Sequence, residues 1–338
     1  MDATVFFAAV TAFAVVVYVL ADGFDLGVGI LFLLAPSESD RDTMMQSVEP
    51  VWDGNETWLV MGGMLLYVGF PAGYYILMPA FYLPVMLMLF ALVFRGIAFA
   101  FRFQGLRLRR VWDFAFAGGS LCATLAQGLI LGGVIAGVPV AGDAFAGGPL
   151  AFLNVEGILC GAGLAAGYSL LGAGWLVWKT EGSAQSFGRT AGRAALILTA
   201  AAMAAVSGWT ALAHGDIAAR WFGWPNIAFL APVPLLTAGV VVALWRALRG
   251  SRDARPFVLA VALFLLGFAG LVVSLWPYVV RPVLTIWDAA SDPGTQIFAG
   301  IGIAIIMPIV LAYQAHAYWV FRGKTLPEAD GAYGSTQP

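Results

Sequence analysis

Two short acidic segments of this chain each border a long apolar run. The first carries Asp22 and Asp25, and the second carries Asp53 and Glu56. Both pairs are spaced i, i+3, which places the two carboxyl groups of a pair on one face of a helix. A carboxyl group can both accept and donate a proton. A row of such groups in a low-dielectric environment is therefore suited to relaying protons.

Two further polar residues belong to this pattern. Asn55 lies inside the second segment, and Arg95, near the end of a later apolar run, is the expected counter-ion. In the alternative interpretation, Asp22 and Asp53 only cap helices or lie at the membrane surface, and Arg95 extends its side chain to that surface. Spacing alone does not decide between a proton path and this structural role.

Composition indicates that these residues lie in a chain surrounded mainly by hydrocarbon. Of the 338 residues, 61 % are hydrophobic and only 11 % are charged, and the mean hydropathy is +0.88. A backbone in hydrocarbon can satisfy its amide groups only in helices or closed barrels, and the apolar runs are long enough for helices. We therefore expect an all-α integral membrane protein.

Hydropathy predicts about nine transmembrane helices. They are expected near residues 4–24, 53–71, 75–99, 112–136, 153–178, 192–213, 226–248, 256–278 and 295–320.

We expect one polytopic membrane domain over residues 1–325 and a disordered tail over 326–338. The first apolar stretch, 4–35, exceeds what a ~30 Å hydrocarbon core requires at about 1.5 Å per residue. It is either one long tilted helix or a helix whose second part turns along the membrane surface.

The basic residues predict the orientation of these spans. Of the 17 Lys and Arg residues, all but Arg220 and Arg281 fall on one side when the nine spans are laid out. Loops rich in Lys and Arg stay in the cytoplasm. The N-terminus is then periplasmic, the C-terminus is cytoplasmic, and both acidic segments lie toward the cytoplasm. The first helix lacks a cleavage site and is expected to be an uncleaved anchor.

Histidine is scarce for a chain that would bind haem. The only two are His214, in an outward loop, and His316, near the inner end of the last span. They cannot clamp a haem between spans, since a multihaem membrane protein needs several axial ligands there. Cys122 and Cys160 fall in apolar stretches and are expected to pack as small hydrophobes. We find no metal-ligand cluster, no phosphate-binding loop and no feature that indicates nucleic-acid binding.

Several segments resemble one known family. Residues 21–29 and 50–59 are similar to the two signature stretches of cytochrome bd oxidase subunit II. Residues 94–102, 174–182 and 284–288, together with the segment 315–324, also resemble family segments in the same order. The likeness extends from residue 4 to residue 324.

This resemblance implies a haem-free subunit II of a quinol:dioxygen oxidoreductase in the bacterial cytoplasmic membrane. The fold would be two four-helix bundles plus one peripheral helix. A homologously folded subunit I, the partner in a heterodimer, would carry the haems and the quinol site and reduce dioxygen to water. This chain alone would not be catalytic and would bind no cofactor. The resemblance leaves open a structural quinone or lipid and a small single-span third subunit.

In the family, protons for water formation come from the cytoplasm along a polar path to which subunit II contributes. The signature acids match Asp25 and Asp53, and Glu56 matches a position that holds Glu or Gln in relatives. Glu there resembles the branch sometimes called cyanide-insensitive oxidases. Relatives often carry an acid in the segment that matches Phe99 to Phe101, whereas this chain has Ala100. The resemblance therefore carries no proton step or ion pair over to that position.

A second hypothesis comes from a different class of protein. Buried acids in a nine-span chain would also suit a stand-alone proton-coupled transporter. The two hypotheses differ in partner dependence, because a transporter would move its solute without a haem-bearing subunit.

Overall fold

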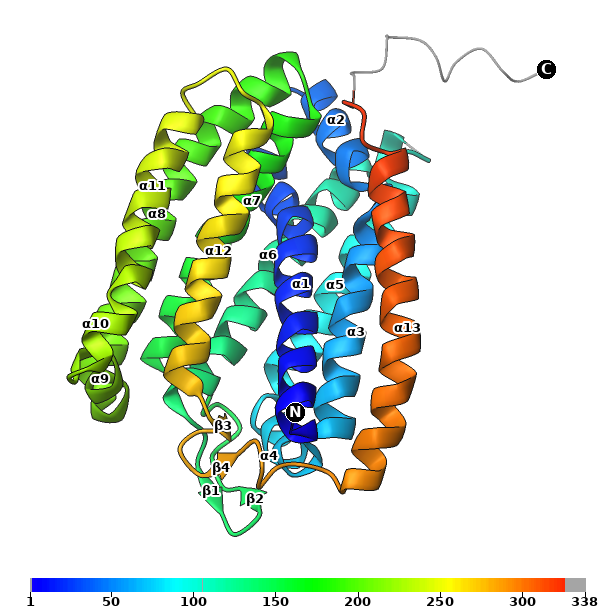
Figure 1. Ribbon diagram of the computed structural model, residues 1–338. Helices are drawn as coiled ribbons and strands as arrows, with labels where there is room; N and C mark the ends of the chain where they lie inside the picture. The colour runs from blue at the N-terminus through cyan, green and yellow to red at the C-terminus, as the bar shows by residue number, and fades with distance from the viewer. Residues whose placement is uncertain (1, 105, 326–338) are drawn as a thin grey trace.

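The computed structural model describes residues 2–104 and 106–325, which form a bundle of long helices (Figure 1). The predicted disorder of residues 326–338 lies outside the described residues. The long helices are α1 (Ala3–Leu31), α3 (Trp52–Gly69), α5 (Tyr82–Phe101), α6 (Arg109–Ala136), α7 (Val155–Lys179), α8 (Gly182–Ala213), α11 (Pro232–Ala247), α12 (Ala254–Leu275) and α13 (Pro293–Val320). The shorter elements are η1 (Phe32–Leu34), α2 (Glu38–Val48), α4 (Pro71–Ala80), η2 (Leu106–Leu108), α9 (Gly215–Phe222), α10 (Asn226–Leu230) and the strands β1 (Val140–Ala141), β2 (Ala144–Phe145), β3 (Tyr278–Val280) and β4 (Leu284–Thr285).

The helices agree with the predicted membrane spans. Within the described residues, eight helices are long and apolar enough to cross a membrane. The remaining predicted span, residues 53–71, corresponds to α3. This helix has 18 residues but carries Asp53 in its first turn and Glu56 one turn later. These charges lower its hydropathy, yet α3 runs alongside α1 and α13 through the bundle (Figure 1). The prediction of an all-α membrane protein is confirmed.

One predicted span is divided. The apolar run predicted as a helix over 75–99 forms two helices, α4 and α5, which meet at Phe81. Proline lacks a backbone N–H and clashes inside a helix but is tolerated in a first turn. The break at Phe81 places Pro84 in the first turn of α5, where proline is tolerated. The apolar run is therefore divided into two helices.

The first apolar stretch forms one long helix and does not turn along the membrane surface midway. Helix α1 continues without interruption for 29 residues, with the Asp2 carboxylate accepting a hydrogen bond from the Thr4 N–H at its start. At about 1.5 Å per residue, the helix is longer than a ~30 Å hydrocarbon core. Only after η1 does the chain turn into α2. We call this end of the bundle the α2 end and the opposite one, where α4 lies, the α4 end (Figure 1).

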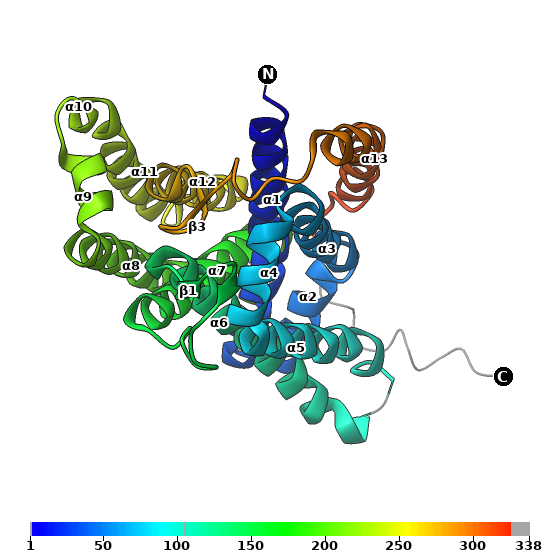
Figure 2. The same cartoon turned by 90° about the horizontal axis from the view of Figure 1, so that it is seen from below.

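The contacts between helices divide the bundle into two groups of four and one further helix. In the first group, α1 contacts α3 and α6, and α6 contacts α5; in the second, α7 and α11 each contact α8 and α12. The groups join where α7 packs against α1 and α6. Helix α13 lies outside both groups, against α1 and α3 (Figure 2). This matches the two bundles plus one peripheral helix that the resemblance implies.

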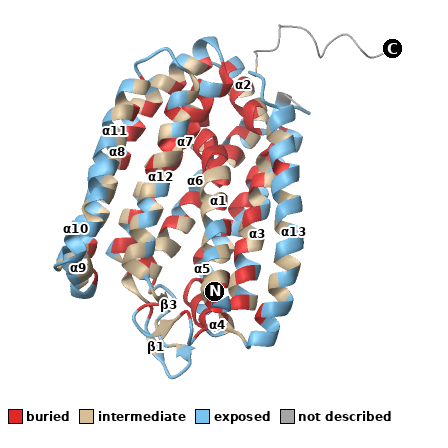
Figure 3. Cartoon of the chain, in the orientation of Figure 1, coloured by how far each residue is buried: buried red, intermediate tan, exposed pale blue. Residues whose placement is uncertain are grey.

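Burial is concentrated near the α2 end, where α1 meets α6 and α7. Helices α8, α11 and α13 bury few of their residues (Figure 3). At the α2 end, buried Arg102 donates hydrogen bonds to Asp113 at 2.6 Å and to Asp42 at 2.5 Å. Asp113 is buried within this ion-pair network. The network joins α5, α6 and α2, and fixes the end of the bundle that holds the acidic segments.

Candidate functional site

Close contact between α1 and α7 buries the first acidic segment. A Cβ atom on Gly27 would lie 1.7 Å from the Tyr168 carbonyl oxygen, and one on Gly172 would lie 2.4 Å from the Gly27 carbonyl carbon. Only glycine permits this approach at the two positions. Asp22 and Asp25 lie just before the crossing, and their exposed fractions are 0 % and 1 %.

Arg95 joins the two acidic segments. Its guanidinium donates one hydrogen bond to Asp22 Oδ1 at 2.5 Å and another to Glu56 Oε2 at 2.8 Å. The Trp52 ring lies 5.6 Å from the guanidinium carbon, within the range of a cation–π contact. Arg95 is fully buried, so it does not extend to the membrane surface. Asp22 lies in the interior of α1 and does not cap it.

Asp25 is held by a second group of polar side chains. Asn55 Nδ2 donates to Asp25 Oδ2 at 2.7 Å. The Asn55 Oδ1 atom accepts hydrogen bonds from Gln314 Nε2 at 2.9 Å and from the Tyr318 hydroxyl at 2.7 Å. These contacts bring α1, α3 and α13 together around Asp25. Together with the Arg95 ion pairs they form what we call the carboxylate cluster, comprising Asp22, Asp25, Asn55, Glu56 and Arg95.

The sequence did not identify Gln314 and Tyr318. The available signal was their i, i+4 spacing on an otherwise apolar helix, which places both polar groups on one face. That spacing does not reveal which helix this face contacts.

The cluster contains more carboxyl groups than cations. In the part of the chain that the structure describes, Arg95 is the one cation that pairs with these acids, through Asp22 and Glu56, and it retains its proton under all ordinary conditions. Asp22 Oδ2 and Asp25 Oδ1 are buried and have no hydrogen-bond partner among the described residues. A buried carboxyl oxygen without a protein donor can bind a proton or a water molecule. The cluster therefore has the chemistry of a proton relay.

Asp53 does not join the other acids. The buried face of α3 carries Asn55, Trp58, Gly62 and Leu65, at the alternating spacing of three and four residues that faces a neighbouring helix. Asp53 lies off this face and is exposed, and its carboxylate makes no hydrogen bond to the described residues. The structure thus brings four of the five predicted path residues together and leaves Asp53 on the outer surface of α3.

A further row of polar groups continues from Asp22 toward the middle of the bundle. Tyr18 lies one turn before Asp22 on α1, and its hydroxyl oxygen accepts a hydrogen bond from Gln127 Nε2 at 2.8 Å. The Tyr168 hydroxyl donates to Gln127 Oε1 at 2.7 Å. This row links α1, α6 and α7 with neutral groups alone.

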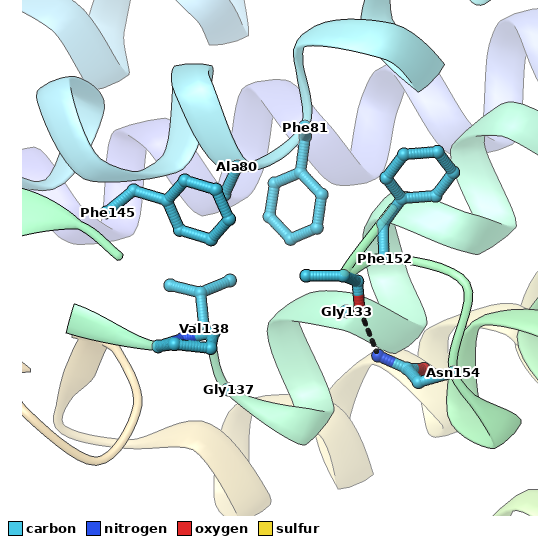
Figure 4. A pocket seen from close by; sticks show the side chains of 10 residues that line it. Ala80, Phe81, Gly133, Gly137, Val138, Phe145, Phe152 and Asn154 are labelled. Carbon is cyan, nitrogen blue, oxygen red and sulfur yellow. Dashed lines mark hydrogen bonds between the residues drawn. The ribbon is translucent and has the colours of Figure 1, made fainter. Parts of the chain in front are cut away.

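A small hollow lies at the α4 end. Phe81, Phe145 and Phe152 surround Gly133 there, and the free volume is about 10 Å³ (Figure 4). This volume is at the lower limit for one water molecule. The hollow is thus a close-packed contact between helices and loops.

The two histidines lie far apart in the fold. His214 follows α8 toward the α4 end, where its Nε2 atom lies 3.1 Å from Glu156 Oε1. His316 lies near the α2 end of α13, with its ring centroid 6.0 Å from that of Trp319. Within residues 2–104 and 106–325, no cluster of three or more His, Cys, Asp or Glu side chains could hold a metal ion.

Comparison with known proteins identifies the family of the chain. The family model described as cytochrome bd terminal oxidase subunit II matches residues 3–321. The chain belongs to this family. It is thus a component of a quinol oxidase complex, and the family implies a partner subunit I. Membership favours the oxidase hypothesis over the stand-alone transporter.

Individual relatives cover nearly the whole chain. Cytochrome bd-I ubiquinol oxidase subunit 2 of Escherichia coli strain K12 is 27 % identical over 350 residues, which cover 92 % of each protein. Cytochrome bd ubiquinol oxidase subunit 2 of Bacillus subtilis strain 168 is 26 % identical and covers 89 % of this chain and 90 % of its own. The solved bd oxidase of Geobacillus thermodenitrificans matches with a TM-score of 0.75 at 11 % identity, over 95 % of this chain and 98 % of that one. This last match shows the shared fold.

Proposed function

We propose that this chain is the haem-free subunit of its oxidase and that it supplies a proton-uptake path from the cytoplasm. Subunit I would hold the haems and the quinol site and would reduce dioxygen to water. The observation that carries the proposal is the buried carboxylate cluster, because ionisable groups at membrane depth are costly and usually mark a pathway. Family membership supports the division of roles between the two subunits.

The cluster would carry protons on its carboxyl groups. Arg95 keeps its charge, so it cannot transfer a proton itself and instead holds Asp22 and Glu56 in position. Asn55 performs the same positioning task for Asp25. Glu56 is half-buried at the surface of α3 and would connect the buried Asp22 with the exposed Asp53.

The proposed orientation places the α2 end in the cytoplasm. The basic residues of the predicted inner loops support it, because Lys and Arg accumulate on the side that is not translocated. In that orientation the carboxylate cluster lies toward the cytoplasmic surface of a bacterial inner membrane. The N-terminus would be periplasmic and the C-terminus cytoplasmic.

The test is Asp25→Asn in the assembled oxidase. The amide keeps the shape of the side chain but cannot carry a proton, so we expect quinol-driven oxygen consumption to fall by about tenfold or more. Haem absorbance of the purified complex should stay at the wild-type level, because the substitution leaves the helix packing intact. Asp143→Asn, on the exposed β1–β2 turn, is the matched control and should leave turnover unchanged. Full activity of Asp25→Asn would remove Asp25 from the path.

The haem-free role has its own test. The chain expressed without subunit I should show no haem band in its absorption spectrum, whereas the co-purified complex should show one. A haem bound by this chain alone would contradict the proposed division of roles.

A further inference from the structure

A second, larger cavity lies at the α2 end. Its volume is about 260 Å³, several times the roughly 30 Å³ that one water molecule occupies in the liquid. The wall is formed by α2, by the ends of α7 and α13, and by the segment that follows α13. The lining residues used in the argument are Gln46, Trp175, Lys179, Tyr318 and Lys324.

Lys179 is the unusual member of this lining. It is the last residue of α7, and only 5 % of it is exposed. Its ammonium group has three hydrogen-bond donors. Two of them bind backbone carbonyl oxygens, of Phe321 at 2.5 Å and of Gly323 at 2.7 Å. Among residues 2–104 and 106–325, no carboxylate lies within ion-pair distance of this group.

The second lysine of the cavity is already neutralised. Lys324 Nζ lies 2.6 Å from Asp253 Oδ2 and 3.7 Å from Glu181 Oε1. The hydrogen bond from Lys324 lowers the pKa of the Asp253 carboxyl below its ordinary value. Asp253 also pairs with Arg189 at 2.8 Å, so Asp253 and Glu181 together balance Lys324 and Arg189. Lys179 is therefore the lining cation whose charge the described residues leave unbalanced.

A buried cation without a counter-charge is costly, and an anion in the cavity would remove that cost. The aromatic residues of the cavity wall indicate where such an anion would come from. Trp175 lies with its ring 5.5 Å from the Lys179 ammonium, and Tyr318 presents a second aromatic surface. Both residue types favour the boundary between hydrocarbon and water. The cavity thus combines a buried ammonium group with aromatic walls of the kind that line the membrane–water boundary.

We propose that this cavity binds a phosphate group, with the third N–H of Lys179 as its main donor and the Gln46 amide as a second donor. The phosphate can belong to the headgroup of an anionic lipid or to free inorganic phosphate. A neutral quinone ring would leave the Lys179 charge unbalanced. The site goes beyond the proposed proton path, although Tyr318 borders both through its hydrogen bond to Asn55.

The test measures binding to the intact, delipidated oxidase by native mass spectrometry. Dioleoylphosphatidylglycerol is added in mixed micelles, and dioleoylglycerol, which has the same chains without phosphate, serves as the matched probe. We expect at least one phosphatidylglycerol to bind the wild-type complex, and Lys179→Met to weaken that binding by about tenfold or more. Lys179→Arg, which keeps the positive charge, should bind phosphatidylglycerol about as well as wild type. Arg252→Met, at an exposed arginine of the neighbouring loop, should change nothing.

A second variant covers the risk that Lys179→Met disturbs the chain after α13. The Gln46 side chain makes no hydrogen bond to the described residues, so Gln46→Leu should leave the fold intact and still weaken binding by severalfold. If inorganic phosphate displaces phosphatidylglycerol, the site recognises the phosphate group alone. If it does not, the site recognises phosphate as part of a lipid headgroup. Equal binding of phosphatidylglycerol to wild type and both variants would overturn the proposal. Equal binding of dioleoylglycerol, or binding of a quinone alone, would also overturn it.

Discussion

At the residue scale, Arg95 determines how three carboxyl groups can coexist inside the bundle. Two of its N–H donors bind Asp22 and Glu56, which lie on different helices. Removing one partner of a buried ion pair leaves the other charge uncompensated, and this usually costs more than the pair itself contributes. The guanidinium is therefore a structural requirement for the carboxylate cluster as well as a counter-ion.

Arg95→Met tests this requirement. Methionine fills similar space without charge, so we expect the substitution to destabilise the assembled complex by about 3–5 kcal/mol. A thermal unfolding measurement of the purified oxidase should show a clearly lowered midpoint. Arg246→Met is the control, because Arg246 is exposed near the end of α11 and its side chain makes no hydrogen bond to the described residues. Equal midpoints for both variants would show that the ion pairs contribute little.

Asp53→Asn separates function from stability. Asp53 is exposed in the first turn of α3 and contacts no other side chain by a described hydrogen bond. Its replacement should therefore leave the unfolding midpoint and the haem content nearly normal. If the proposed path passes through this acid, quinol-driven oxygen consumption should nevertheless slow severalfold. Unchanged oxygen consumption would take Asp53 out of the path and leave Glu56 as its outermost group.

Part of the site could be predicted from helical spacing. The i, i+3 pairs correctly placed Asp22 and Asp25 on one face, because both belong to a single helix whose period is fixed. The same spacing could not show that α3 turns Asn55 inward and Asp53 outward. That choice depends on which face of α3 packs against α1, and this is a property of the folded bundle.

At the element scale, hydropathy predicted the spans because each long helix must hide its backbone from hydrocarbon. It could not predict the break at Phe81, since residues 71–94 carry no charged side chain on either side of it. Nor could it predict how closely two spans approach. The contact of α1 with α7 depends on Gly27 and Gly172 facing each other, a pairing that neither helix reveals alone.

Gly27→Ala tests whether this close contact positions the carboxylate cluster. The added methyl group would overlap the Tyr168 carbonyl oxygen, so α1 and α7 must separate at a cost of about 1–3 kcal/mol or more. We expect a lower unfolding midpoint and reduced turnover, because Asp22 and Asp25 lie on the displaced helix. Gly239→Ala on α11 is the matched control, since its methyl group would meet nothing within 4 Å. Its effect should be neutral or slightly stabilising, because alanine favours helix.

At the scale of the whole molecule, the outer face of α3 is uncovered. Val60, Met64 and Tyr67 follow Asp53 along this helix and expose 71 %, 63 % and 50 % of their surfaces. Either lipid or another protein must cover this stripe in the membrane. Because Asp53 lies at one end of the stripe, a partner seated here would contact the surface of the proposed proton path.

Loss of this chain should therefore destabilise subunit I. A partner deprived of subunit II would expose its own half of a large apolar interface, which favours dissociation or aggregation. We expect subunit I produced without this chain to lose most of its haem absorbance and all of its quinol-driven oxygen consumption. Co-expression with the Asp25→Asn chain should restore the absorbance but not the oxygen consumption, because that variant keeps the interface and lacks the proton carrier. A subunit I that kept haem and activity on its own would show that this chain neither supports its partner nor supplies its protons.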